Sequence, residues 1–338
     1  MRRKLISIPF QIIGIVTITF ILVRIIPGDP ARLMMGPNVP EAGVQMMRER
    51  LGLTGSIAQQ YIDYLISLCH GELGFSWVTG NKVIDDIIQR LPATLELLLY
   101  TLLVIFLVMI PIAFKAMSKG ESKIKKTLKK ILFTYGMAAG SFPDFWLALI
   151  LVFLLYVILG LAPAPVGRLD IGLLAPKFIT GMYSIDSLLT GNWKVFLSSL
   201  HHLMLPVFVL SFVYGGTVIK TAIISAMEIN KSTYIEYFNV CGLPISTMEK
   251  YIKKASYVNV IILAVINFGF LIGGAVLVET VFSWPGFGRY AVQSVVNADF
   301  AAIQGVVLFA SILNLIAYIL ADAINIVIDP RFRKHNIY

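Results

Sequence analysis

Charge is scarce in this chain. Only 14% of its 338 residues are Asp, Glu, Lys or Arg, whereas a soluble domain carries roughly 25% of these residues. Hydrophobic residues make up 57% of the sequence. This composition argues against a soluble globular protein and predicts a chain that lies largely within a lipid bilayer.

Motifs for catalysis and for cofactor binding are also missing. The sequence has no Gly-x-x-x-x-Gly-Lys-Ser/Thr loop, which excludes ATP binding by that route, and no Gly-x-Ser-x-Gly nucleophile elbow. Its histidines and cysteines form no cluster with metal-ligand spacing. His201 and His202 are adjacent, so on a helix they point in different directions. We therefore expect no catalytic residue, no bound metal and no cofactor on this chain.

Long apolar runs, in contrast, are abundant. A membrane-spanning helix needs roughly 17–25 predominantly apolar residues, and six segments of about this length are present. They are residues 5–26, 95–114, 145–161 with a lead-in from 131, 203–224, 258–282 and 303–328. The predicted fold class is an all-α integral membrane protein with six transmembrane helices.

Positive charge gathers in alternate connections between these spans. The basic residues concerned are Arg2, Arg3, Lys4, Lys115, Lys119, Lys123, Lys125, Lys126, Lys129, Lys130, Lys231, Lys250, Lys253, Lys254, Arg331, Arg333 and Lys334. Cytoplasmic loops carry an excess of Lys and Arg, so this side of the membrane, with both termini, is predicted to be cytoplasmic. The placement accounts for the net charge of +9, and nucleic acid is not an expected partner.

The chain divides into three predicted regions. Residues 1–93 form the first transmembrane helix, retained rather than cleaved as a signal peptide, and an extracytoplasmic helical cap. Residues 94–328 form a core of five helices, and residues 329–338 form a cytoplasmic tail. Apolar residues at helical spacing predict three amphipathic helices in the cap, near residues 47–51, 57–68 and 84–91. Cys69 falls outside and Cys241 inside, so the two cannot form a disulfide.

A polar interruption separates the fourth span from the fifth, within residues 228–256. Its pattern predicts two short amphipathic helices joined at a glycine. Their apolar stripes are Ile235, Phe238 and Cys241 in the first helix and Ile245, Met248, Ile252 and Ala255 in the second. Gly242 suits a left-handed helix end because it has no Cβ, and Pro244 suits the first turn of the next helix. Crossing a bilayer needs no such element, and we therefore interpret it as a binding site for a soluble partner protein.

The polar residues inside the predicted spans each have more than one interpretation. Four ionisable residues lie near span ends, where anchoring at the interface or pairing between helices would account for them. They are Glu96, Lys220, Glu279 and Asp322. Asn267 and Asn314 lie near the middle of their spans, where each either hydrogen-bonds another helix or lines a cavity.

Two further features of the fifth span and its exit have a packing interpretation. Gly269, Gly273 and Gly274 would let this helix approach a neighbour closely. The following Trp284-Pro285-Gly286 sequence is either a turn at the membrane interface, where tryptophan is enriched, or part of a gate that receives substrate.

Six segments, in order along nearly the whole chain, resemble one protein family. They are Val23–Pro30, Gly71–Gly74 with Ser76, Arg90–Leu97, Ser141–Leu147, Val278–Arg289 and Asp329–Arg333. The family is that of permease subunits of bacterial ABC importers of the dipeptide/oligopeptide type, which also serve nickel and some sugars. The segment Val278–Arg289 is the most specific of the six.

The resemblance implies half of a transporter with the type I ABC importer permease fold. Such a permease works in the cell membrane with a second permease, two cytoplasmic ATPases that hold ATP and Mg, and an extracytoplasmic substrate-binding protein. The residues that would couple to an ATPase are Tyr234, Ile235, Glu236, Phe238, Gly242 and Leu243. Those of an extracytoplasmic gate or docking site would be Glu279, Trp284, Pro285, Gly286 and Arg289. Asn267 and Asn314 are candidates for lining the pathway.

The coupling segment departs from the family pattern. Glu236 and Gly242 hold the outer positions of the family's Glu-Ala-Ala-x-x-x-Gly, but Tyr237 and Phe238 replace its two alanines. The added bulk implies either an ATPase cleft that is correspondingly wider, which we favour, or weakened coupling through this chain.

The sequence leaves alternatives open both for the substrate and for the class of function. Peptide is the expected substrate, with nickel or another metal chelate, or an oligosaccharide, as alternatives within the same architecture. A membrane scaffold or sensor that uses the altered coupling segment without transport is another alternative. A membrane enzyme would need paired carboxylates, metal ligands or a Ser/Lys pair at facing depths, and the sequence shows none of these.

Overall fold

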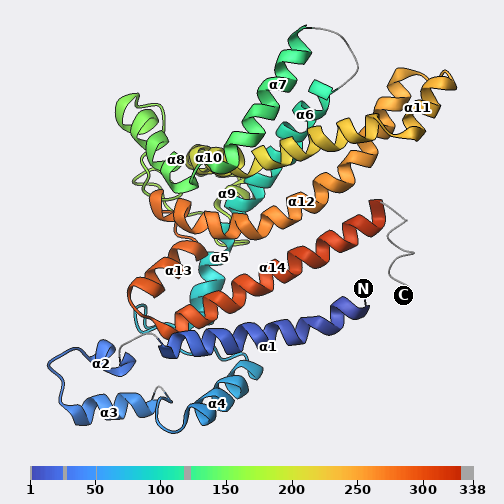
Figure 1. Cartoon of the computed structure of the whole chain (residues 1–338). Coiled ribbons are helices and arrows are strands. Elements are labelled where there is room, and N and C mark those ends of the chain that lie inside the picture. Colours follow the sequence, from blue (N-terminus) through green and yellow to red (C-terminus); the bar gives the residue numbers. More distant parts are fainter. Residues whose placement is uncertain (1, 26–28, 51, 118–122, 329–338) are drawn as a thin grey trace. The chain divides into compact units, whose positions relative to one another are not determined.

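The computed structural model describes residues 2–25, 29–50, 52–117 and 123–328, whose regular structure is helical without a β-strand (Figure 1). The chain forms two compact units, Met1–Leu91 with Arg289–Leu315 and Pro92–Gly288 with Ile316–Tyr338. The helices α5 (Val83–Val104), α13 (Phe287–Val296) and α14 (Phe300–Ile328) each contribute residues to both units. The predicted tail, residues 329–338, lies outside the described residues, as does part of the resembling segment Val23–Pro30.

The first unit begins with α1 (Arg2–Ile25), α2 (Pro30–Met35), α3 (Glu41–Arg50) and α4 (Ile57–Cys69). The ring of Phe20 in α1 packs on α4, with centroid distances of 5.2 Å to Tyr61 and 5.7 Å to Tyr64. Asp29 caps α2 and accepts a hydrogen bond of 2.9 Å from Arg48 Nε in α3. The hydrogen bonds from Arg48 hold the pKa of Asp29 below its usual value.

Two of the three predicted cap helices correspond to α3 and α4. The third, expected near residues 84–91, is wrong as a separate helix, because α5 runs unbroken from Val83 to Val104 with Pro92 inside it. This helix continues through a π-helical turn, η1 (Ile105–Met109), into α6 (Ile110–Met117). The predicted second span is thus the later part of a longer rod.

The second unit is built around α10 (Trp193–Asn230). Its further elements are α7 (Lys123–Ala138), η2 (Ala139–Ser141), α8 (Asp144–Leu151), η3 (Val152–Ile158), α9 (Tyr183–Leu189), α11 (Thr233–Val240) and α12 (Ile245–Val281). α10 contacts α6, α7, α8, α9 and α12, and an apolar cluster from residues 105–114, 218–226 and 260 joins it to α6 and α12. α7 crosses α10 closely at Gly136, where a Cβ would lie 2.7 Å from Gly216 O.

Within the described ranges, four helices are long and apolar enough to cross a membrane: Val83–Met117, Trp193–Asn230, Ile245–Val281 and Phe300–Leu320. A fifth crossing is possible if the bent pair Lys123–Ser141 and Asp144–Ile158 forms one span. The first predicted span is helical, but its apolar part, Ile8–Leu22, is shorter. The described residues therefore form an all-helical structure with four candidate membrane spans, or five with the bent pair.

The third predicted span is not a straight helix. Its two parts meet at an angle of 104°. Phe142 and Pro143 are extended, with ψ angles of 125° and 126°. A proline disfavours the helical conformation of the residue before it and lacks the N–H that would continue a helix. The bend therefore follows from Pro143, which lies between the predicted span and its lead-in.

Candidate functional site

The predicted coupling segment, residues 228–256, contains the end of one long helix, a short helix and the start of a second long helix. α10 ends at Asn230, the short α11 runs from Thr233 to Val240, and α12 begins at Ile245 (Figure 1). Gly242 has a φ of +69°, as predicted, and a Cβ there would meet nothing within 4 Å. The glycine is therefore required by backbone conformation rather than by packing. Leu243 N donates to Phe238 O at 3.1 Å, which closes the helix end in the manner of a Schellman motif.

The second short helix predicted in this segment is wrong as a separate element. α12 starts at Ile245, after Pro244 as its N-cap, and continues without a break to Val281. The stripe of Ile245, Met248, Ile252 and Ala255 is thus the first part of a spanning helix. A displacement of α11 would act directly on this long rod, because only residues 241–244 connect them.

The side chains of α11 divide into an inner and an outer set. Ile235 is fully buried, and Phe238 packs on α12 with its ring centroid 5.3 Å from that of Tyr251. Tyr234, Tyr237 and Val240 are 44%, 65% and 82% exposed, and Glu236 is exposed as well. Cys241, predicted to belong to the apolar stripe, is exposed instead. The side chains of the outer set therefore form an aromatic and apolar surface that is exposed in the described part of the chain.

A second group of predicted residues lies around the other end of α12, from Glu279 in its last turn through the turn at residues 282–286 to Arg289 in α13. Trp284 is fully buried and its indole Nε1 donates to Ala93 O at 3.0 Å. Glu279, also fully buried, accepts a hydrogen bond of 2.5 Å from Thr94 Oγ1, which in turn accepts from Phe287 N at 2.8 Å. The turn is thus fastened to residues 93–94 of α5.

Glycines are required for this fastening. A Cβ at Gly286 would collide with the carboxylate of Glu279, and one at Gly288 would lie 2.7 Å from Val276 Cα. Pro285 is exposed. Arg289 belongs to the first unit. The turn is held by protein contacts on the buried indole of Trp284, and its two interpretations, a turn at the membrane interface or part of a gate, both stay predictions.

A buried ion pair, not predicted from the sequence, joins α5 to the loop before α9. Arg168 Nη2 lies 2.5 Å from Glu96 Oε2, and the two side chains are 5% and 1% exposed. The other oxygen of Glu96 accepts from Ser184 N at 2.7 Å and Ser184 Oγ at 2.5 Å. Arg168 also lies 3.5 Å from the Tyr183 ring centroid. We call Glu96, Arg168, Ser184, Glu279, Thr94 and Trp284 the buried polar network.

The carboxylate of Asp186 in α9 closes the loop that precedes this helix, because it accepts hydrogen bonds from residues 179–181. Burial alone would raise the pKa of Asp186, but hydrogen bonds from the Thr180 hydroxyl and from three backbone N–H groups hold it below its usual value. Those N–H groups belong to Ile179, Thr180 and Gly181. Interface anchoring does not describe Glu96 or Glu279, because both carboxylates are buried and hydrogen-bonded inside the protein. The sequence signal for this network is that Arg168 is the sole arginine in residues 162–202.

The two asparagines of the spans differ. Asn267 is buried, and its Nδ2 donates to Thr217 Oγ1 at 2.9 Å and to Tyr214 O at 3.3 Å, which ties α12 to α10. Asn314 donates to Ala310 O of its own helix at 3.1 Å. Gly274 allows a close approach, since a Cβ would collide with Tyr214, whereas Gly273 faces open space.

No group of three His, Cys, Asp or Glu side chains in the described ranges could hold a metal ion. His202 is buried, with Nδ1 3.0 Å from Ser198 O and Nε2 3.9 Å from Asp170. A hydrogen-bonded role within the fold accounts for this ring.

Comparison with known proteins gives consistent matches over the whole chain. Residues 1–98 match the N-terminal family described as "Binding-prot-dependent transport system membrane comp, N-term", and residues 109–334 match "Binding-protein-dependent transport system inner membrane component". The chain is 35% identical to the probable D,D-dipeptide transport system permease protein DdpB of Escherichia coli (strain K12), over 99% of this chain and 97% of that protein. It is 32% identical to the di/tripeptide transport system permease protein DppB of Pseudomonas aeruginosa (strain UCBPP-PA14), over 98% and 97%. The oligopeptide transport system permease protein AppB of Bacillus subtilis (strain 168) is 29% identical over 98% and 97%.

Proposed function

The chain belongs to the family of binding-protein-dependent transport system inner membrane components, and from this we propose that it is a permease subunit of an ATP-driven importer of peptides. The names of its relatives, which are permeases for dipeptides, tripeptides and oligopeptides, support this substrate class. In this proposal the chain forms half of the translocation pathway and has no catalytic residue of its own.

The partners follow from the same proposal. A substrate-binding protein delivers peptide on one side, and two ATPase subunits bind ATP and Mg on the other. A second, similar permease completes the pathway, most simply as a heterodimer. The side with the coupling segment, the basic α7 and both termini is cytoplasmic, as the distribution of Lys and Arg favours.

The observation that carries the proposal is the position of α11 in the chain, between the two long helices α10 and α12. The helices on either side contain 38 and 37 residues, and α11 is joined to them by residues 231–232 and 241–244 alone. ATP-driven closure of the ATPases would move α11, and α10 and α12 would follow as rigid rods and rock around the pathway. Tyr234, Glu236, Tyr237 and Val240 form the surface that meets the ATPase, because they are exposed.

This geometry bears on the departure from the family pattern. Of the two bulky residues in place of alanines, Phe238 packs within the chain against Tyr251, and only Tyr237 faces outward. A matched ATPase cleft therefore has to accommodate one additional ring at this position rather than two. We retain the matched cleft as the proposal over weakened coupling.

The remaining assignments concern the pathway and its far end. Glu279, Trp284 and Gly286 hold the turn that presents the exposed Pro285, with Arg289 just beyond it, toward the substrate-binding protein. Asn267 and Asn314 are proposed to face the pathway in one of its conformations. In the present conformation Asn267 is engaged with α10.

Uptake of a labelled dipeptide by cells that produce the chain with its partner subunits tests the proposal. Gly242→Val should abolish uptake and substrate-stimulated ATP hydrolysis while membrane insertion is retained, because valine is strained at a φ of +69°. Gly191→Val is the matched control, because Gly191 has the same φ of +69° and equally open space but lies outside the coupling segment. Normal uptake by Gly242→Val, or uptake of nickel chelates or oligosaccharides but not of peptides, would contradict the proposal.

A further inference from the structure

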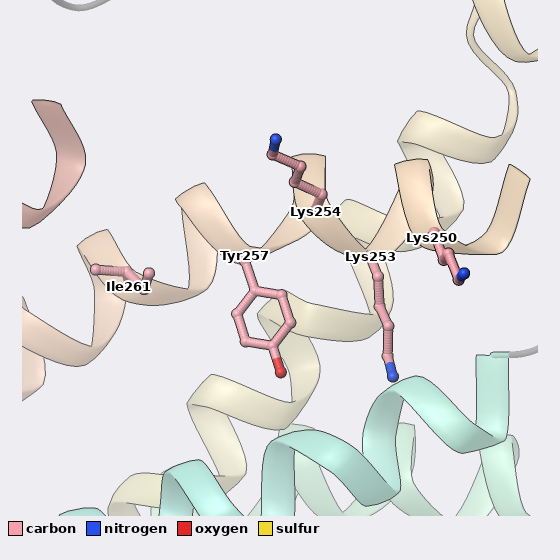
Figure 2. Close-up of a pocket in the computed structure, with 5 residues that line it drawn as sticks. All are labelled: Lys250, Lys253, Lys254, Tyr257 and Ile261. Carbon is pink, nitrogen blue, oxygen red and sulfur yellow. The ribbon is translucent and has the colours of Figure 1, made fainter. Parts of the chain in front are cut away.

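A pocket lies on one face of α12, close to the start of the helix and directly after α11. It is lined by Lys250, Lys253, Lys254, Tyr257 and Ile261 (Figure 2). The spacing of three, four, seven and eleven residues from Lys250 places all five residues on one face of the helix. From this face Lys254 extends in the opposite direction to Lys253 and Tyr257 (Figure 2). The lysines stand at the polar end of this face and Ile261 at its apolar end.

The neighbouring helix α6 supplies an aromatic wall. Phe114 is buried, and its ring centroid lies 5.0 Å from that of Tyr257. Lys253 Nζ lies 5.9 Å from the centroid of the Phe114 ring. Figure 2 shows Lys253 and Tyr257 extending toward the neighbouring helix, which narrows the space between the two elements.

The lysines of this pocket take part in no salt bridge within the part of the chain that the structure describes. All three lysines are exposed, and none of them forms an ion pair with a described carboxylate. Like charges four residues apart on a helix repel each other. An anion bound among the three ammonium groups would offset this repulsion.

The order of charged and apolar side chains along this face of α12 indicates which kind of anion would bind. The lysines immediately precede the apolar run of α12, which begins near Val258, so they stand at the level where a membrane-water interface is expected. From Lys250 to Ile261 the helix rises about 16 Å. A ligand that follows this face is therefore negatively charged at one end and apolar at the other.

We propose that this pocket binds an anionic phospholipid of the inner leaflet. The phosphate-bearing headgroup lies among Lys250, Lys253 and Lys254, and an acyl chain lies along Tyr257 and Ile261. Basic pockets between membrane helices on the cytoplasmic side bind such headgroups. The inference rests on the membrane orientation in the proposed function. An acidic protein surface would use the lysines but leaves the apolar continuation of the face unexplained.

The test is a lipid titration of the purified full-length chain in detergent, read by native mass spectrometry. Phosphatidylglycerol should bind more tightly than phosphatidylcholine, and replacing the lysines in K250Q/K253Q/K254Q should weaken phosphatidylglycerol binding about tenfold or more. The charge-preserving K250R/K253R/K254R should stay within about twofold of the parent. Its retained binding would show that the pocket still folds.

The matched control removes the same charge elsewhere on the same side. K125Q/K126Q/K129Q changes three lysines of α7 that do not line the pocket. It should bind phosphatidylglycerol as the parent does. Equal losses in both triple variants, an unchanged K250Q/K253Q/K254Q, or displacement of the lipid by inorganic phosphate at equal concentration would each overturn the proposal. Peptide uptake is not the readout, so a failure of the proposed function would appear separately in the Gly242→Val experiment.

Discussion

The helix α12 begins at Ile245, after a segment whose outer surface is exposed, and ends at Val281, before a turn in which Trp284 and Gly286 are buried. At the first end, α11 is attached through Ile235 and Phe238, and its outer surface is uncovered. At the other end, Glu279, Trp284 and Gly286 are enclosed, and the indole and the carboxylate are both hydrogen-bonded. The two regions lie at opposite ends of a helix about 55 Å long.

The difference between the coupling segment and the buried polar network has a physical consequence. A surface with few internal contacts can be moved by a partner at little cost, whereas a network of buried charges tolerates no partial loss of its partners. We infer that one end of α12 is built to be displaced and the other to stay fixed. The predictions below test this contrast, in order of decreasing effect.

The largest effect is expected in the buried polar network. Arg168→Met would leave the carboxylate of Glu96 buried and without its cation, and we expect a loss of about 3–5 kcal/mol in the free energy of unfolding. Denaturant titration in detergent micelles measures this loss. The double variant E96Q/R168M should recover part of it, and Lys177→Met, a change at an exposed cation, should be nearly neutral. Equal stability of Arg168→Met and Lys177→Met would remove the contrast.

The next effect separates the inner and outer sets of α11. Ile235→Ala empties a fully buried site and should cost about 2–5 kcal/mol. Val240→Ala, at a site that is 82% exposed, should change the free energy of unfolding by no more than about 0.5 kcal/mol. It should instead weaken copurification with the ATPase subunits. A loss of stability in both variants would mean that the outer surface is covered within the chain.

A smaller effect is expected at Gly286. Alanine there would force its Cβ against the Glu279 carboxylate, and overpacking of this kind costs about 1–3 kcal/mol. Gly273→Ala is the control in the same part of the chain, because a Cβ at Gly273 meets nothing within 4 Å and alanine favours a helix. Thermal unfolding of the two variants should therefore shift in opposite directions, and a stable Gly286→Ala would show that the turn is not tightly packed.

Local signals made the backbone of residues 233–245 predictable from the sequence. Gly242 and Pro244 specify the backbone around them, so the break between α11 and α12 could be placed to within a residue. The continuity of α5 through Pro92 and the bend before Pro143 could not, because a proline in an apolar run either lies within a continuous helix, as Pro92 does, or breaks it, as Pro143 does. The pairing of Glu96 with Arg168 was also missed, since it joins residues 72 positions apart and no local pattern encodes it.

The most direct test of the account uses the two native cysteines, both of which are exposed. A benzophenone maleimide attached to Cys241, in a Cys69→Ser background, should cross-link on illumination to an ATPase subunit in the assembled transporter. The same reagent on Cys69, in a Cys241→Ser background, should not reach an ATPase. Cross-linking of the ATPase from Cys69, or its absence from Cys241 in an assembled complex, would contradict the claim that α11 is the element that couples ATP hydrolysis to this chain.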